Sequence, residues 1–202
     1  MLPVSFYDRD TADVARDMLG AILECETEDG VASGRIVETE AYIGADDPAC
    51  HAVAGRTRRT WHLFGPAGIA YVYFIYGVHW CFNAVTGAEG VGSAVLVRAV
   101  EPVDGVALMR ARRPRAKRIA DLTNGPGKLC SALGIDGAID GASLQTSSLR
   151  IRAGSVVSDR DVLVSPRIGI TRAAEWPLRW YVKGNPYVSS TPRHFLQKPI
   201  TP

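Results

Sequence analysis

The chain has 202 residues, 47% of them hydrophobic, which is enough to bury one substantial core and predicts a single domain over residues 1–202. Charged residues make up 22% and no run of about 18 apolar residues occurs, which excludes a disordered chain or a membrane span. The net charge of +2 is too small to indicate nucleic-acid binding by itself. Since no basic stretch leads into an apolar segment near Met1, we expect a cytoplasmic protein, nucleoid-associated in a bacterium.

The cysteines are few and widely spaced, unlike the dense disulfide framework of a small secreted protein. Reduced thiols are therefore expected. Neither Cys50 beside His51 nor Cys81 two residues after His79 has the spacing of a common zinc module. We expect no metal site and no other cofactor.

The first hundred residues predict one short helix and then strands. Asp10 is placed to cap a helix that ends at Gly20. Two β-prone runs follow at residues 21–25 and 31–40, and an Asp29-Gly30 turn between them predicts an antiparallel hairpin. The next 25 residues are rich in turn formers, which favours a long functional loop without regular structure.

An aromatic β segment covers residues 69–85 and bends at Gly77, and residues 91–100 predict a further strand. Pro102 is a candidate first residue of a helix, and residues 126–133 predict a second helix closed by Gly134. Short strands are expected at 149–152, 162–164 and 178–182. This order predicts an α+β fold: a compact domain with a curved, mostly antiparallel sheet, peripheral helices and a protruding aromatic hairpin.

Glu38 and Glu40 alternate with Thr39 along a predicted strand, so both side chains project from the same face. Such a pair is able to supply acid and base groups to a glycosidic bond. The alternative is a pair of exposed glutamates matched to arginines across the sheet, and spacing alone favours this structural interpretation.

Aromatic residues nearby favour chemistry on a base. Tyr71 and Tyr73 share a strand face, and the rings of Tyr42 and His51 precede them in the chain. Facing rings sandwich a purine, and they bind a positively charged, alkylated purine particularly well. Ordinary packing is the alternative. Tyr76, at the turn before Gly77, is expected to be exposed, where it would act as a wedge in the minor groove.

Two groups of basic residues are candidates for phosphate contacts, or else ordinary solvated surface. Lys128, at the start of a predicted helix in Gly-Pro-Gly-Lys, is also a candidate for a DNA phosphate contact, although the sequence fails as a Walker motif. The two groups are Arg56, Arg58 and Arg59, and Arg110, Arg112, Arg113, Arg115, Lys117 and Arg118.

Four segments in order resemble the alkyladenine (3-methyladenine) DNA glycosylases. They are Arg-Ile-Val-Glu-Thr-Glu-Ala-Tyr at 35–42, Tyr-Val-Tyr-Phe-Ile-Tyr-Gly at 71–77, Leu-Val-Arg-Ala-Val-Glu-Pro at 96–102 and Gly-Pro-Gly-Lys-Leu-Cys at 125–130. The resemblance extends from Phe6 to Val188, nearly the whole chain. It implies a DNA repair glycosylase that flips alkylated or deaminated purines from double-stranded DNA and hydrolyses the N-glycosidic bond.

The resemblance also implies roles for single residues. Glu40 would activate the attacking water, with Glu38 structural, and Arg98 would help to hold the water and the nucleotide's phosphate. The flipped base would lie among Tyr42, His51, Tyr73 and Asn83, and Asn83 would reject the amino group of guanine. Tyr76 would intercalate, while Lys128 and Arg59 are candidate backbone contacts.

The resemblance is weakest at residues 55–61, where the family's proline and asparagine are missing. Leu63 stands where a bulky family residue presses on the opposite DNA strand. With no lysine singled out as a nucleophile, a monofunctional enzyme is expected, which leaves an abasic site without strand cleavage. We also expect a monomer. Two alternatives stay open: a hydrolase of small nucleosides or sugars, and a non-catalytic nucleic-acid binding module.

Overall fold

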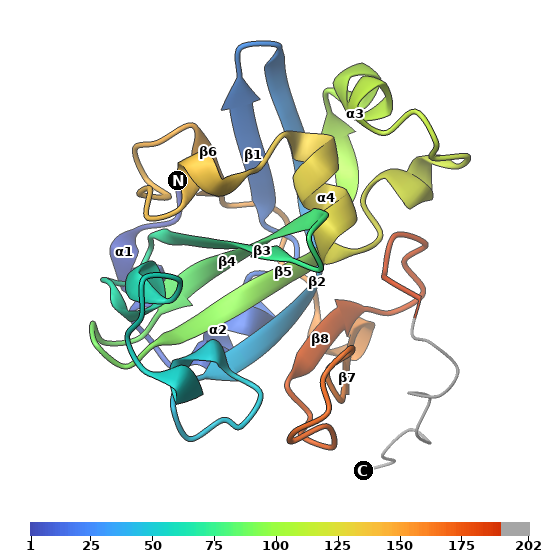
Figure 1. Cartoon of the computed structure of the whole chain (residues 1–202). Coiled ribbons are helices and arrows are strands. Elements are labelled where there is room, and N and C mark those ends of the chain that lie inside the picture. Colours follow the sequence, from blue (N-terminus) through green and yellow to red (C-terminus); the bar gives the residue numbers. More distant parts are fainter. Residues whose placement is uncertain (191–202) are drawn as a thin grey trace.

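The computed structural model describes residues 1–190 and contains an antiparallel sheet of eight strands (Figure 1). Six strands follow the order β3-β4-β5-β2-β1-β6, and β8 pairs with both β2 and β7. The strands are β1 Ile22–Thr27, β2 Gly30–Ile43, β3 Ala70–Ile75, β4 His79–Thr86, β5 Ser93–Asp104, β6 Leu149–Arg152, β7 Val162–Ser165 and β8 Arg179–Val182.

Short helices surround the sheet, and α2 lies behind the central strands (Figure 1). The α-helices are α1 Val4–Tyr7, α2 Thr11–Asp17, α3 Val106–Arg112 and α4 Pro126–Leu133. The 3-10 helices are η1 His51–Ala54, η2 Trp61–Phe64, η3 Ile119–Leu122, η4 Gly137–Ile139 and η5 Asp159–Asp161. The predicted α+β class with a mostly antiparallel sheet is confirmed.

Several elements begin and end where their local chemistry predicts. The side chain of Asp10 caps α2 by accepting hydrogen bonds from the Ala12 and Asp13 amides. Helix α4 begins at Pro126 and ends at Gly134, whose φ of 80° lies in the left-handed region. These matches arise because caps and turns depend on neighbours in the chain.

Three predictions about local structure were wrong. The β1–β2 turn consists of Glu28 and Asp29, while Gly30 already pairs with Thr27. Pro102 lies inside β5 opposite Gly34, where the register with β2 shifts, and the helix starts only after Gly105. A proline is tolerated at such an irregularity because a ladder hydrogen bond is already missing there. The long loop also includes the single turns η1 and η2.

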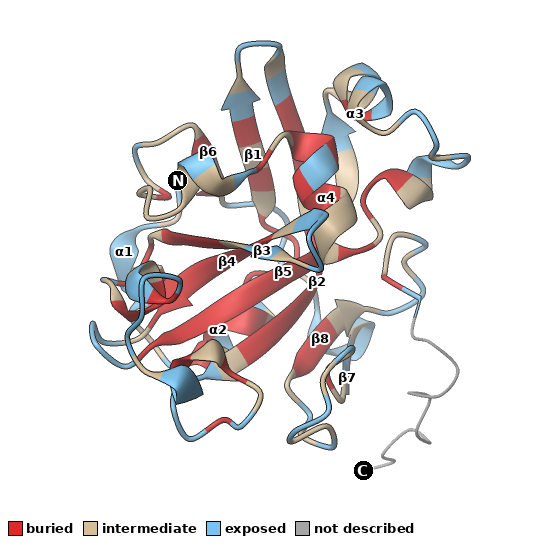
Figure 2. Cartoon of the chain, viewed as in Figure 1, coloured by how far each residue is buried: buried red, intermediate tan, exposed pale blue. Residues whose placement is uncertain are grey.

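The central strands separate a hydrophobic core from the functional face, and Figure 2 shows them as largely buried. Alternation along β2 explains this separation. The hydroxyl of Thr39 donates to the carbonyl of Ala15 in α2, on the core side. Glu38, Glu40 and Tyr42 therefore project from the other face of the sheet.

Candidate active site

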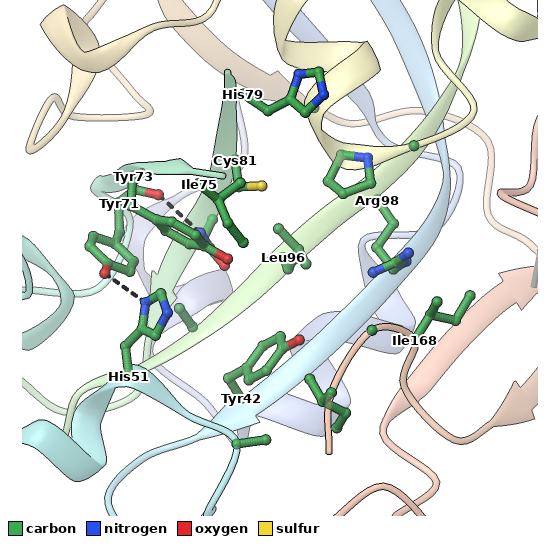
Figure 3. A pocket seen from close by; sticks show the side chains of 18 of the residues that line it. Tyr42, His51, Tyr71, Tyr73, Ile75, His79, Cys81, Leu96, Arg98 and Ile168 are labelled. Atoms are coloured by element: carbon green, nitrogen blue, oxygen red, sulfur yellow. Dashed lines mark hydrogen bonds between the residues drawn. The ribbon is translucent and has the colours of Figure 1, made fainter. Parts of the chain in front are cut away.

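A cavity of about 420 Å³ lies on this second face, large enough to admit a purine base (Figure 3). It is formed by β2, the β3–β4 hairpin, β5, the first turn of α4 and residues 168–170. Its lining is mainly aromatic and aliphatic and includes Tyr42, His51, Leu63, Tyr71, Tyr73, Cys81, Asn83, Leu96, Arg98, Lys128 and Ile168. The structure thus brings together the whole predicted base pocket.

Glu38 and Glu40 are both fully buried, so the exposure assumed in the structural interpretation was wrong, but the expected pairing with arginines across the sheet is present, through Arg98 and Arg179. Their strand is irregular here, because the β2–β5 register shifts on both sides of Glu38. Bulges of this kind re-aim side chains next to active sites. The two carboxylates still share one face, since Arg98 donates to both.

Glu38 has no free capacity for chemistry. Its Oε1 accepts hydrogen bonds from Arg98 Nε at 3.2 Å, Arg179 Nε at 2.6 Å and Ser189 Oγ at 2.7 Å. Its Oε2 accepts from the Ser189 amide at 2.7 Å. A buried carboxylate requires partners of this kind, and here they join β2 to β5, β8 and the segment after β8. Glu38 therefore holds strands together.

Glu40 shares Arg98 with Glu38, but all three of its side-chain hydrogen-bond partners line the cavity. The Ile168 amide donates to Oε1 at 2.7 Å, and Oε2 accepts from the Tyr42 hydroxyl at 3.0 Å and from Arg98 Nη1 at 3.1 Å. Burial and the charge of Glu40 raise the pKa of Tyr42, so its hydroxyl stays protonated and keeps donating. Glu40 consequently lies directly behind the cavity wall.

Arg98 connects the two carboxylates from β5, and its side chain is only 9% exposed. Burial alone would lower the pKa of its guanidinium, but the charges of Glu40 and Glu38 outweigh burial and raise it. Arg179 supplies a second cation at Glu38, so two arginines balance the two carboxylates. Arg98 is therefore held in place by both carboxylates, and its guanidinium lines the cavity.

The opposite wall is aromatic. The rings of His51 and Tyr73 meet edge to face at 4.5 Å between centroids, and those of Tyr71 and Tyr73 lie 5.4 Å apart. His51 Nδ1 and the Tyr71 hydroxyl share a hydrogen bond of 2.9 Å. In Figure 3 these rings and Tyr42 border the same space from different sides.

The charge state of this wall follows from its burial. Burial raises the pKa of Tyr73 and of Tyr71, so both phenols are neutral at physiological pH. Burial, with the nearby Arg59 as a second cause, lowers the pKa of His51 below its ordinary 6.5. The wall is therefore uncharged near neutral pH.

Asn83 projects from β4 and is 4% exposed. Its amide nitrogen donates to the carbonyl of Tyr71 at 3.1 Å, which fixes the side chain at the cavity surface. Beside it Cys81 lines the same region, and burial raises the pKa of its thiol to about 11. Cys81 is thus a neutral, unreactive part of the wall.

Tyr76 is 81% exposed at the tip of the β3–β4 hairpin, as predicted. Its φ of 54° is left-handed, as is the φ of 68° at Gly77, and the Val78 amide closes the turn on Ile75. A tyrosine in this conformation costs on the order of 1–2 kcal/mol. Despite this cost, the turn directs the large ring of Tyr76 into solvent next to the cavity.

The two candidate backbone contacts lie at different rims. Lys128 lines the cavity from α4, and its ammonium donates to Asn124 Oδ1 at 2.8 Å. Arg59 is exposed, with its guanidinium 5.5 Å from the centroid of the Tyr73 ring. Both cations are thus near the entrance.

The expectation for Leu63 was wrong. Its side chain is 2% exposed and forms part of the cavity wall, so it is unable to press on a DNA strand. In the same loop Trp61 is 59% exposed and lies beneath the guanidinium of Arg56. Two arginines of the larger basic run already form hydrogen bonds within the protein: Arg112 binds Thr27 and Asp29, and Arg118 binds Asp121.

Sequence reasoning missed two contributors from the end of the chain. The Ile168 amide binds Glu40, and the ion pair of Arg167 with Asp47 lies directly behind Tyr42. Their partners are more than 100 positions away, and no local pattern marks them.

Within residues 1–190 no group of three or more His, Cys, Asp or Glu side chains is arranged to hold a metal ion. No helix in this part of the chain is long and apolar enough to cross a membrane. All four cysteines are buried and free.

The fold and the cavity define an α+β protein with a buried carboxylate behind an aromatic cavity, and comparison with known families identifies its family. The chain matches the model of the family described as methylpurine-DNA glycosylase (MPG) over residues 5–186. Since this match covers most of the chain, the protein belongs to the methylpurine-DNA glycosylase family.

Similar curated proteins come from archaea and bacteria and carry the name "Putative 3-methyladenine DNA glycosylase". The protein of Methanoculleus marisnigri is 50% identical over 191 residues, which are 93% of this chain and 98% of that protein. The protein of Myxococcus xanthus is 49% identical over 201 residues, 98% of each chain. The protein of Salinibacter ruber is 50% identical over 200 residues, 93% of this chain and 96% of that protein.

Proposed function

We propose that this protein is a monofunctional DNA glycosylase of base-excision repair. Its substrates are alkylated or deaminated purines of the 3-methyladenine and hypoxanthine type in double-stranded DNA, and its product is an abasic site. The observation that carries the proposal is the position of one buried carboxylate, Glu40, immediately behind a cavity with aromatic walls that admits a purine base.

The aromatic residues bind the extruded base. Tyr42, Tyr73 and His51 offer ring faces and edges around one space, and their neutral rings favour an alkylated purine, which carries positive charge. Asn83 is fixed at the cavity surface, where it would reject the exocyclic amino group of guanine. Recognition thus depends on stacking and on the exclusion of a normal base.

Glu40 supplies the base catalysis. A water oxygen attacks the anomeric carbon, the water's proton moves to the Glu40 carboxylate, and the electron pair of the N-glycosidic bond leaves with the purine. The negative charge also stabilises the cationic sugar of the transition state. Arg98 holds the carboxylate at 3.1 Å and faces the cavity, in reach of the water or of the target nucleotide's phosphate.

DNA approaches through its minor groove in this proposal. Tyr76 fills the gap left by the flipped nucleotide, because it is the exposed ring beside the cavity. Lys128 and Arg59, at the rims, contact the backbone. The protein acts as a monomer, since one chain contains the whole cavity. It acts in the cytoplasm and, if the cell is a bacterium, on the nucleoid.

The test is excision from defined oligonucleotides. Duplexes that each carry hypoxanthine, ethenoadenine or a methylated purine are incubated with the protein and then cleaved with alkali at any abasic site. Strand breaks only after alkali support a monofunctional glycosylase. Borohydride trapping of a protein–DNA adduct would instead indicate an amine nucleophile.

Two controls separate the alternatives. Release of base from a free nucleoside at a similar rate would favour a small-substrate hydrolase. Tight binding to lesion DNA without any release of base would favour a binding module. A small-substrate hydrolase does not explain why an exposed tyrosine in a costly backbone conformation stands next to the cavity, whereas a binding module would use the same tyrosine and is distinguished by base release alone.

A further inference from the structure

Arg167 lies in the segment between β7 and β8, and its side chain is fully buried together with that of Asp47. The contact is bidentate: Arg167 Nη1 donates to Asp47 Oδ2 at 2.5 Å and Nη2 donates to Oδ1 at 2.8 Å. Nη1 also donates to the carbonyl of Ala41 on β2 at 2.9 Å. One guanidinium thus ties the segment between β7 and β8 to the end of β2 and to the loop that follows β2, more than 100 positions away in the sequence.

The ion pair touches the base pocket from behind. The Arg167 guanidinium lies 4.6 Å from the centroid of the Tyr42 ring, which lines the cavity. The amide of the next residue, Ile168, donates to Glu40 at 2.7 Å. Arg167 is therefore adjacent both to a stacking ring and to a donor that orients the proposed base.

Asp47 fixes the other side of the arrangement. Beyond Arg167 it accepts hydrogen bonds from the amides of Ala49 at 3.0 Å and Ile43 at 3.3 Å. These bonds shape the loop that continues through Cys50 to His51, a ring of the aromatic wall. The pair consequently connects residues on both sides of the cavity.

The pair is not optimised for stability alone. Arg167 Nε is buried without a hydrogen-bond partner, a defect that costs free energy. Apolar residues of similar volume often replace a buried ion pair without loss of stability. A costly arrangement next to two site residues points to a role in geometry.

We infer that Arg167, paired with Asp47, is a positioning residue that holds Tyr42 and the Ile168–Glu40 contact in the geometry required for excision. The inference rests on the proposed function. It acts through Tyr42 and Glu40, and Arg167 itself does not touch the base. Displacement of a reacting group by about 1 Å is sufficient to reduce a rate about 100-fold.

The experiment replaces the pair by uncharged residues of similar size, in the double variant Asp47→Asn and Arg167→Met. The introduced asparagine keeps a side-chain oxygen for the Ala49 amide, and no unpaired charge is buried. The matched control is the double variant Glu26→Gln and Arg150→Met, which removes an ion pair of 2.6 Å between β1 and β6, outside the cavity lining. Thermal melting, the single-turnover excision rate and affinity for DNA with an abasic-site analogue are measured.

We expect the Asp47→Asn, Arg167→Met variant to fold and bind the abasic analogue within threefold of the wild type, while its excision rate falls about 10- to 100-fold. The control should keep the wild-type rate. A folded double variant that excises within threefold of the wild type would overturn the inference. That result would mean that the ion pair is needed only for folding, since uncharged residues of similar size then support the full excision rate.

Two further outcomes are decisive. If the double variant does not fold, Arg167→Lys keeps the charge but loses the bidentate fork, and a wild-type rate in that variant also overturns the inference. If the wild-type protein excises none of the bases tested, the proposed function is wrong and the inference fails with it. Excision by the wild type with unaffected Arg167 variants removes only the inference.

Discussion

The two walls of the cavity are built in opposite ways. The carboxylate wall, where Arg98 lines the cavity and Glu38, Glu40 and Arg179 lie behind it, is buried and held by hydrogen bonds between charged groups. The aromatic wall, formed by His51 and the β3–β4 hairpin, is held by ring contacts and ends in the exposed Tyr76. Fixed charges suit a bond-breaking step, whereas neutral rings and a free tip suit recognition of a flipped base.

Removal of the charge on Glu40 should have the largest effect, because it should abolish the contribution of the carboxylate wall to excision and leave binding by the aromatic wall intact. Glu40→Gln keeps the size of the side chain but is unable to accept the water's proton, so the single-turnover excision rate should fall about 10²- to 10⁴-fold. Binding to lesion DNA depends on the aromatic wall and should persist. Near-normal turnover in this variant would contradict the assignment of Glu40 as the base.

Glu38→Gln should affect stability instead. The substitution leaves Arg98 and Arg179 without their shared carboxylate, and removal of one partner from a buried ion pair costs about 3–5 kcal/mol. Urea unfolding monitored by circular dichroism gives the loss. Glu26→Gln, which removes an exposed partner of Arg150, is the control and should cost no more than about 1 kcal/mol. Equal losses in both variants would mean that Glu38 is not a structural centre.

The sequence distinguishes these two glutamates only through the family resemblance. Strand alternation predicts that they share a face, which the contacts with Arg98 confirm. Their different partners come from β8, from Ser189 and from Ile168, which lie well over 100 positions away in the chain. Such contacts follow from tertiary packing and leave no local pattern.

Other features were predicted correctly where they depend on local sequence and incorrectly where they depend on tertiary packing. The bounds of α4 and the exposed turn at Gly77 were predictable because proline, glycine and strand alternation act locally. Pro102 was placed wrongly because its tolerance inside β5 depends on a register shift with β2. The burial of Leu63 depends on packing against residues of three strands. Long-range geometry, more than residue type, limited the prediction.

Truncation of Tyr76 tests the aromatic wall at its tip. Tyr76→Ala removes the proposed wedge, which offsets part of an unstacking cost of a few kcal/mol, so affinity for lesion duplex should fall about tenfold. Val78→Ala, at the same tip and 66% exposed, is the control and should change affinity less than threefold. Because φ at residue 76 is positive, Tyr76→Gly should not destabilise the fold. A loss of affinity that is equal in the Val78 variant would refute a specific wedge.

The smallest effect should come from titration of His51. Its lowered pKa means that the imidazole is more than half neutral at pH 6.5 and gains most of its proton as the pH falls further. Protonation would place a positive charge beside a cationic base, so affinity for 3-methyladenine DNA should decline as the imidazole gains its proton, at a lower pH than an ordinary histidine would require. NMR titration of the imidazole measures its pKa directly.

Two variants decide whether that decline belongs to the aromatic wall. His51→Asn should remove the part of the decline that follows the imidazole, and any slope that remains then belongs to other groups. Arg59→Ala removes one cause of the lowered pKa and should move the titration of His51 to higher pH, but not restore the ordinary pKa, because burial is the larger cause. If the wild-type imidazole titrates above pH 6.5, the wall is charged near neutral pH. Discrimination in favour of cationic purines would then have to come from the carboxylate wall.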